Sequence, residues 1–235
     1  MALVHSHSLC DTVNAVNDAF LHGKGIAPGE RRRTASWIAG RQGLPGAYAG
    51  TFALFSDELR DGIRLLTGER TRSAAARHIA GEEACRALRL LDVPDASVKR
   101  ALDSASASLA ARVGPIAPPT GSGHRFDAYR GGVFCCGRCS VGVWRHIVAG
   151  GFDDHERRLQ IGLEYLASMR SDDHSWSTFP FWYTVSALIE MPTDLARPHL
   201  QHAASRLARA ADRTPGDELF ARRRHAIARR AMTLL

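Results

Sequence analysis

Three cysteines lie close together in the chain, at Cys135, Cys136 and Cys139 of the run GGVFCCGRCSVGVWRH. Thiols in a C-x-x-C pair can bind zinc, and they can exchange disulfides when the first thiol stands at the start of a helix. They can also pack as small apolar side chains in a core. One pair supplies only two of the four ligands that a structural zinc ion needs. His155 and His174 follow in later loops and are our candidates for the others.

From the residues alone, packing at the start of a central helix is the interpretation that we favour for these cysteines. The alternating strands and helices that accompany a thioredoxin-type C-x-x-C are missing, which argues against a redox role. A zinc site that uses Cys136 and Cys139 with His155 or His174 stays open as an alternative. Cys10 and Cys85 stand alone in helical surroundings, where we expect buried small side chains.

The tripeptide Asp-Asp-His occurs twice, at residues 153–155 and 172–174. Paired carboxylates beside a histidine are the residue types of acid–base catalysis or of a metal site. Asp172, Asp173 and His174 are therefore the catalytic candidates of this chain. Both copies stand at helix-start or loop positions, where aspartates commonly cap helices, and capping is the interpretation that we favour.

Aromatic side chains are densest in the segment SWSTFPFWY, residues 175–183. As the lining of a cavity they would suit an apolar ligand, so Trp176, Phe181, Trp182 and Tyr183 are our candidates for ligand binding. The alternative is that they form core at a junction between helices.

Apolar residues recur at helical spacing through most of the chain. The pattern predicts helices over residues 9–22, 71–91, 134–149, 154–170, 181–191, 195–211 and 216–234. In the helix over 71–91, Ile79, Leu88 and small residues share one face, and we expect Glu82, Glu83 and Arg86 on the outer face. The polar residues around His78 and Glu82–Glu83 either line a pocket between helices or form a buried salt-bridge network.

The run GPIAPPTGSG, residues 114–123, is too rich in proline and glycine to continue a helix. We predict a linker there, between an N-terminal helical lobe over 1–113 and a C-terminal helical lobe over 124–235. The expected fold class is all-α: antiparallel helical hairpins in a partial, toroid-like array of two lobes.

Residues 139–191 resemble the repeat of the terpenoid cyclase and protein prenyltransferase superfamily. The residues that carry the resemblance are Asp172, Asp173, His174 and Trp176 in a loop, followed by Phe181, Tyr183, Thr184, Ala187 and Leu188 at the start of a helix. The resemblance implies an α/α ring whose inner helices surround an apolar cavity. The acidic D-x-D-D run of the cyclases is absent from the sequence, so the resemblance carries the fold and no catalytic residue.

The composition is that of a globular protein, with 45% hydrophobic and 23% charged residues among 235. There is no apolar stretch of membrane-spanning length and no leader peptide pattern, so we expect a cytoplasmic protein without a membrane span. Of 31 basic residues only Lys24 and Lys99 are lysine, and residues 195–235 hold nine arginines against three acidic residues. Arginines on the outer face of a terminal helix are usually solvated, so nucleic acid is not the partner that we expect first.

Two functions remain open on this basis. The first is binding of a hydrophobic, isoprenoid-like small molecule in an aromatic-lined helical cavity. The second is a non-enzymatic helical scaffold, with zinc as a possible stabilising ion, that binds an acidic protein or nucleic acid through the Arg-rich C-terminal helices. A chain of roughly four hairpins is short of the six that complete a ring in the resembling superfamily. Three outcomes therefore stay open: a partial ring, pairing with a second copy, or a fold that encloses no cavity.

Overall fold

The computed structural model describes residues 2–117 and 129–235. The chain is predominantly helical, as expected, with three pairs of two-residue strands among the described residues. The helices are α1 Leu9–Leu21, α2 Pro28–Ala39, α3 Ser56–Asp61, α4 Ser73–Leu91, α5 Ala96–Val113, α6 Gly137–Val148, α7 His155–Ser168, α8 Phe181–Leu188, α9 Thr193–Ala211 and α10 Leu219–Met232, with a short 3-10 turn η1 at Tyr48–Gly50.

The strand pairs are short connectors between helices. β1 Ile63–Arg64 pairs with β2 Arg70–Thr71, and β5 Arg170–Ser171 pairs with β6 Ser175–Trp176, both antiparallel. β3 Ile116–Ala117 pairs in parallel with β4 Tyr129–Arg130. These pairs stiffen the turns without forming a sheet of independent stability.

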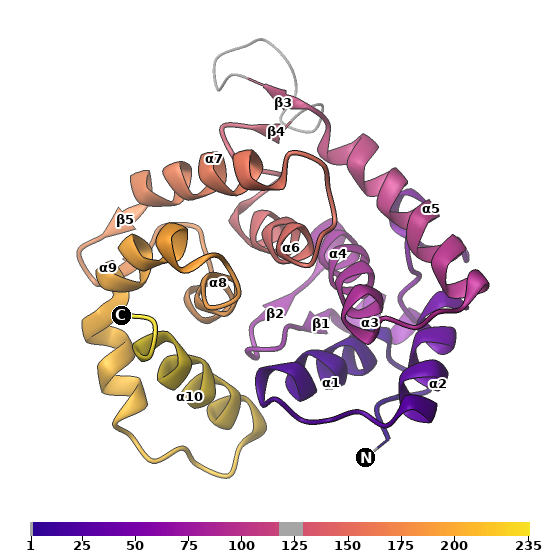
Figure 1. Ribbon diagram of the computed structural model, residues 1–235, viewed down its shortest axis with the longest axis horizontal. Coiled ribbons are helices and arrows are strands. Elements are labelled where there is room, and N and C mark those ends of the chain that lie inside the picture. The colour runs from indigo at the N-terminus through magenta and orange to yellow at the C-terminus, as the bar shows by residue number, and fades with distance from the viewer. Residues whose placement is uncertain (1, 118–128) are drawn as a thin grey trace.

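Five helices form a closed ring of contacts. α1 packs on α4, α4 on α6, α6 on α8, α8 on α10, and α10 returns to α1. Figure 1 shows α4, α6 and α8 near the middle and α2, α5, α7 and α9 around the periphery. The helices of the C-terminal half therefore contact those at the start of the chain.

One continuous core runs through both halves of the chain. It includes Val13 and Ile79 from the N-terminal half and Trp144, Leu163 and Leu207 from the C-terminal half. α4 and α6, which belong to different halves, are extensively packed against each other. The predicted linker, residues 114–123, follows α5, and its residues 118–123 lie outside the described residues.

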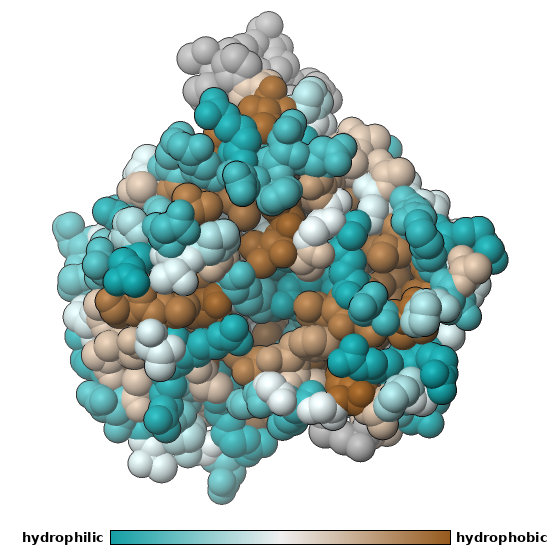
Figure 2. Space-filling model, viewed as in Figure 1, coloured by the Kyte–Doolittle hydropathy of each residue, from teal (hydrophilic) through white to brown (hydrophobic). Residues whose placement is uncertain are grey.

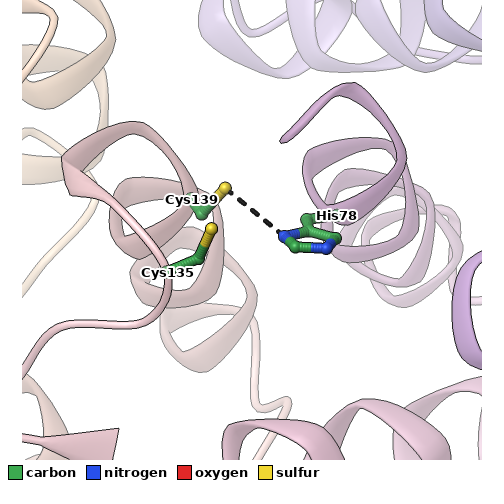
Figure 3. A group of neighbouring side chains, drawn as sticks. All are labelled: His78, Cys135 and Cys139. Atoms are coloured by element: carbon green, nitrogen blue, oxygen red, sulfur yellow. Dashed lines mark hydrogen bonds between the residues drawn. The ribbon is translucent and has the colours of Figure 1, made fainter. Parts of the chain in front are cut away.

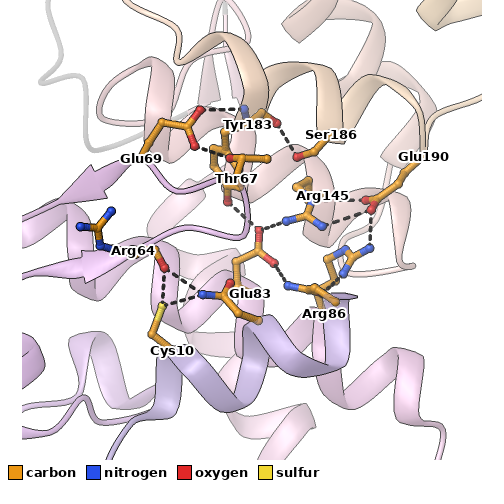
Figure 4. A network of polar contacts seen from close by, with 12 residues as sticks. Cys10, Arg64, Thr67, Glu69, Glu83, Arg86, Arg145, Tyr183, Ser186 and Glu190 are labelled. Carbon is orange, nitrogen blue, oxygen red and sulfur yellow. Dashed lines mark hydrogen bonds and ion pairs between the residues drawn. The ribbon is translucent and has the colours of Figure 1, made fainter. Parts of the chain in front are cut away.

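A buried polar network joins four of the five ring helices, and Figure 4 shows its centre. The Arg145 guanidinium on α6 donates to Glu83 on α4 at 2.5 Å, and Tyr183 on α8 donates its hydroxyl hydrogen to the same carboxylate at 2.6 Å. Asn17 on α1 donates to Glu83 at 2.9 Å. Glu190, just after α8, pairs with Arg145 at 3.1 Å.

The prediction that Glu82, Glu83 and Arg86 face outward is therefore wrong. Their exposed fractions are only 1%, 6% and 4%. α4 has neighbours on several sides, namely α1, α2, α5 and α6, so no face of its middle turns reaches solvent. The alternative of a buried salt-bridge network is confirmed for Glu83, which pairs with Arg145, whereas Arg86 joins the network through Glu190 at 2.7 Å without having been predicted to do so.

The surface shown in Figure 2 is a mixture of hydrophilic and hydrophobic residues. Within the described residues, no helix combines the length and the apolar character that crossing a membrane requires.

Candidate metal centre

The packing of α4 on α6 brings a histidine to the cysteines. His78 lies one turn and a half into α4, and Cys139 lies in the first turn of α6. Gly137 opens α6, and a Cβ at that position would lie 2.5 Å from the carbonyl oxygen of Thr178. Only glycine allows this close approach, so the C-x-x-C segment rests directly on the backbone that leads into α8.

Three possible ligand atoms meet there: the imidazole of His78 and the sulfur atoms of Cys135 and Cys139. All three lie within 4.8 Å of one another. The His78 Nδ1 atom is 3.7 Å from the Cys139 sulfur, and Figure 3 shows this contact with Cys135 beside it. Among the described residues, this is the group of histidine, cysteine and acidic side chains whose spacing suits a metal ion.

Cys136 extends this group toward solvent. Its side chain is exposed, whereas Cys139 is buried and Cys135 is half-buried. The groups that act most on the Cys136 thiol are the neighbouring thiols of Cys139 and Cys135 and the backbone N–H groups of Cys139 and Arg138. Cys136 occupies the N-cap position of α6, where unpaired N–H groups favour a thiolate. Packing accounts for Cys139 and does not account for an exposed Cys136.

The pKa values of Cys136 and Cys139 are shifted in opposite directions. The hydrogen bond from Cys139, with the backbone N–H groups of Cys139 and Arg138, lowers the pKa of Cys136 to about 5. The same hydrogen bond and burial raise the pKa of Cys139 well above its ordinary value. Burial lowers the pKa of His78, which keeps the imidazole neutral at pH 7. A thiolate beside a neutral imidazole is the donor chemistry of a soft metal site.

Aromatic rings hold His78 in place. Tyr48 lies against the imidazole, with ring centroids 4.2 Å apart, and Phe134 lies on it at 5.6 Å. The side chain of His78 is 6% exposed, so its ring has little freedom to turn away from Cys139. The sequence pattern did not single out this histidine as a ligand, because it stands far from the cysteines along the chain.

His155 and His174 lie elsewhere. Both are exposed, and neither belongs to the group around Cys139. The His174 imidazole is 3.1 Å from the backbone carbonyl of His202, on α9. The histidine that the fold places beside the cysteines is thus His78 from the N-terminal half.

The acidic candidates form a turn and not a catalytic pair. Asp172 and Asp173 are exposed, and Asp173 accepts hydrogen bonds from Ser171 and Ser175 within the β5–β6 turn. In the first Asp-Asp-His copy, Asp154 is the N-cap residue of α7, yet its side chain accepts no capping hydrogen bond. The helix-capping interpretation is therefore wrong for both copies: Asp173 stabilises the β5–β6 turn, and Asp154 makes no capping hydrogen bond.

The aromatic candidates mostly pack against one another. Trp176 and Phe181 are buried and stacked with ring centroids 5.9 Å apart, and Trp182 meets Phe181 edge-on at 5.0 Å. Tyr183 differs, since it lines a cavity between α1, β1, α4 and α8 that also contains Glu83. The volume of this cavity is about 10 Å³. That is close to the space that one water needs.

Several arginines of the C-terminal helices have partners inside the molecule. Arg223 is buried and pairs with Asp18 at 2.8 Å. Arg206 pairs with Asp173 at 3.5 Å, and its guanidinium lies 3.9 Å from the centre of the Phe181 ring. Some of the arginines that were candidates for binding an acidic partner therefore form ion pairs within the molecule instead. The exposed arginines of this segment are Arg197, Arg209, Arg213, Arg222, Arg229 and Arg230.

The chain matches no protein-family model, no curated protein and no solved structure, so a functional proposal rests on the chemistry of the cluster itself.

Proposed function

We propose that the protein is a zinc-binding helical scaffold whose ion is held between α4 and α6 by His78, Cys135 and Cys139. The observation that carries this proposal is the convergence of an imidazole nitrogen and two sulfur atoms within 4.8 Å of one another. His78 and Cys139 come from helices in different halves of the chain and Cys135 lies just before α6, so the ion acts as a cross-link at the largest helix contact of the ring.

The geometry suits zinc. Zn–S bonds of about 2.3 Å and Zn–N bonds of about 2.0 Å at tetrahedral angles place ligand atoms roughly 3.5 Å apart. The 3.7 Å between His78 Nδ1 and the Cys139 sulfur fits that spacing. Sulfur and imidazole ligands together favour Zn²⁺ over Mg²⁺ or Ca²⁺, which prefer oxygen. Cys136 lies outside the group whose ligand atoms are within 4.8 Å of one another, and as the next exposed thiol it is the candidate for a fourth ligand after a side-chain movement.

The experiment is a metal analysis of the protein purified without chelators, supported by Co²⁺ titration of the metal-free protein. We expect about one zinc ion per chain and a cobalt–thiolate absorption band. His78→Ala and Cys139→Ser lose both signals, while His155→Ala, His174→Ala and Cys85→Ala keep them. Circular dichroism establishes that each variant is folded. A folded wild type without zinc and without the cobalt band, or a Cys139→Ser variant that keeps both, contradicts the proposal.

A second candidate is binding of a small apolar molecule in the cavity at Tyr183 and Glu83. It is favoured by one observation, namely that the cavity is lined almost entirely by apolar side chains of α1, β1 and α4. A ring of inner helices around an apolar cavity is also what the resemblance of residues 139–191 to prenyltransferase and cyclase repeats implies. Because the cavity has room for about one water, an isoprenoid-sized ligand requires α1 or β1 to move outward.

Thermal denaturation tests this second candidate. A short isoprenoid alcohol raises the melting temperature of the wild type if it binds the folded state. Ala80 lines the cavity, so Ala80→Leu fills it and removes the effect. An equal rise in both proteins places the ligand elsewhere, and no rise in the wild type rejects the candidate.

A further inference from the structure

The arrangement of Cys136 and Cys139 suits a reversible chemical step. Cys136 is exposed at the N-cap of α6, and Cys139 is buried one turn further along. Cys136 is the N-cap residue of α6 and Cys139 is its third helical residue. An N-cap side chain ordinarily points toward the third residue of its helix, so a small movement brings the two sulfur atoms to disulfide distance.

We propose that Cys136 and Cys139 form an oxidisable dithiol that a hydroperoxide converts to a disulfide, and that this reaction expels the zinc ion. The expulsion rests on the proposed zinc centre, whereas the disulfide does not. Exposure decides the order of events, because a peroxide reaches Cys136 and not the buried Cys139.

The peroxide oxidises the two thiols in two stages. The Cys136 sulfur attacks one peroxide oxygen, the O–O bond breaks, and an alcohol or water leaves with one proton, which gives a sulfenic acid at Cys136. The Cys139 sulfur then attacks the Cys136 sulfur, an S–S bond forms, and hydroxide leaves as water; its proton comes from the Cys139 thiol in the metal-free protein and from solvent where zinc holds Cys139 as a thiolate. Two electrons pass from two sulfur atoms to the peroxide. Neither sulfur remains a thiolate ligand, so the ion retains only His78 and Cys135 and dissociates.

Cys135 is the competing partner, and its backbone argues against it. Its φ angle of +60° places it in the left-handed region, outside the helix that positions Cys139. Cys136 and Cys135 are adjacent in sequence, and disulfides between neighbours need a distorted backbone. The Cys135 sulfur lies within 4.8 Å of the Cys139 sulfur and is the alternative partner of Cys139, but Cys136 is the more exposed thiol and the one that the oxidant reaches first.

The test treats the full-length zinc-loaded protein with hydrogen peroxide and follows released zinc with a colorimetric chelator. Trypsin then separates residues 131–138, with Cys135 and Cys136, from residues 139–145, with Cys139. In the wild type we expect the two peptides to be joined until a reductant is added, with zinc release at the same rate. In Cys136→Ser we expect no joined peptides, whereas Cys135→Ser and the control Cys85→Ala still give them.

The outcomes separate the two proposals. Joined peptides in a protein that never contained zinc support the dithiol and reject the zinc centre. Zinc present and retained while the disulfide forms rejects the expulsion. An absence of joined peptides in the wild type, or their persistence in Cys136→Ser, overturns the dithiol itself.

Discussion

At the scale of single residues, the backbone at Cys135 is the most informative feature of the cluster. Its φ of +60° lies in a region that costs a residue with a side chain about 1–2 kcal/mol relative to the right-handed region. Glycine is free of that cost. A cysteine at this position is consistent with a side chain that is retained for what its sulfur binds.

We therefore predict opposite effects of Cys135→Gly in the presence and absence of zinc. Without the ion, relief of the strained backbone raises the free energy of unfolding by about 1 kcal/mol, less what the half-buried side chain contributes. With zinc, the variant is less stable than the wild type because a ligand is lost. Urea denaturation with and without a chelator measures both. The same ranking in both buffers counts against a ligand role for Cys135.

Gly137 offers a second residue-scale prediction. A methyl group there would meet the Thr178 carbonyl oxygen at 2.5 Å, and the obstacle is backbone, which cannot swing aside. Gly137→Ala should lower the free energy of unfolding by about 1–3 kcal/mol, the usual effect of overpacking. It should also weaken zinc binding, because the first turn of α6 must move. Gly29→Ala is the control, since its added Cβ meets nothing within 4 Å. Equal stability of the two variants would refute this account.

The cysteines could be identified from the sequence as a candidate site, but their histidine partner could not. His78 and Cys139 are brought together by the packing of two helices from different halves of the chain. The sequence around either residue does not indicate that contact. One signal was present in α4 itself. Ala or Gly occurs on every face of ARHIAGEEACRA, which is typical of a helix enclosed by neighbours, so a histidine within it is buried.

At the scale of elements, the helices with a clear apolar stripe were predictable and the others were not. α4, α7, α9 and α10 begin and end within a few residues of their predicted bounds. α2 was missed, because Pro28 was taken as a helix breaker although it stands at the first position of that helix, where proline is well tolerated. In addition, α2 begins with the charged run ERRR and buries only Thr34, Ala35 and Ile38, so its apolar periodicity is too weak to detect in the sequence.

The interaction of Glu190 with α4 and α6 gives a prediction on pH. Burial alone would raise the pKa of Glu190, but the guanidiniums of Arg145 and Arg86 outweigh it and hold the pKa below its usual value. A carboxyl group with a depressed pKa stabilises the fold above its unfolded pKa, about 4.3, and this contribution is lost as pH falls through the folded pKa. The network therefore weakens in acid.

Glu190→Gln should lower the free energy of unfolding at pH 7 by about 2 kcal/mol, the scale of hydrogen bonds to charged groups. The difference from the wild type should shrink as the pH falls below about 4, because the wild-type carboxyl then becomes neutral as well. Denaturant titrations at several pH values measure it. Glu164→Gln, at an exposed glutamate, is the control and should show no comparable difference. A gap that is constant across the pH range would contradict the role of this carboxylate.

At the scale of the whole molecule, one buried ion pair joins the last helix to the first. Arg223 on α10 donates to Asp18 on α1 at 2.8 Å, and both side chains are about nine-tenths buried. Burial alone would raise the pKa of Asp18, but Arg223 and Lys24 hold it below the usual value. Arg223→Met keeps most of the side-chain volume and should lower the free energy of unfolding by about 3 kcal/mol, since it leaves a buried carboxylate with only the more exposed Lys24 and His22 near it. Arg222→Met, at an exposed neighbour, should change stability little.

The closed ring of helices also decides how the molecule unfolds. The sequence suggested two lobes with a linker between them, and two independent lobes would unfold in separate transitions. One core spans α4 and α6, and the Glu83–Arg145 pair and the Asp18–Arg223 pair each join the two halves. We therefore predict a single cooperative transition. The test uses the Trp37→Phe variant, whose remaining tryptophans, Trp144, Trp176 and Trp182, all lie in the C-terminal half. Its tryptophan fluorescence follows unfolding of that half, and far-ultraviolet circular dichroism follows unfolding of all the helices. Coincident midpoints support one folding unit, and a fluorescence midpoint that departs from the circular dichroism midpoint would show that the halves fold separately.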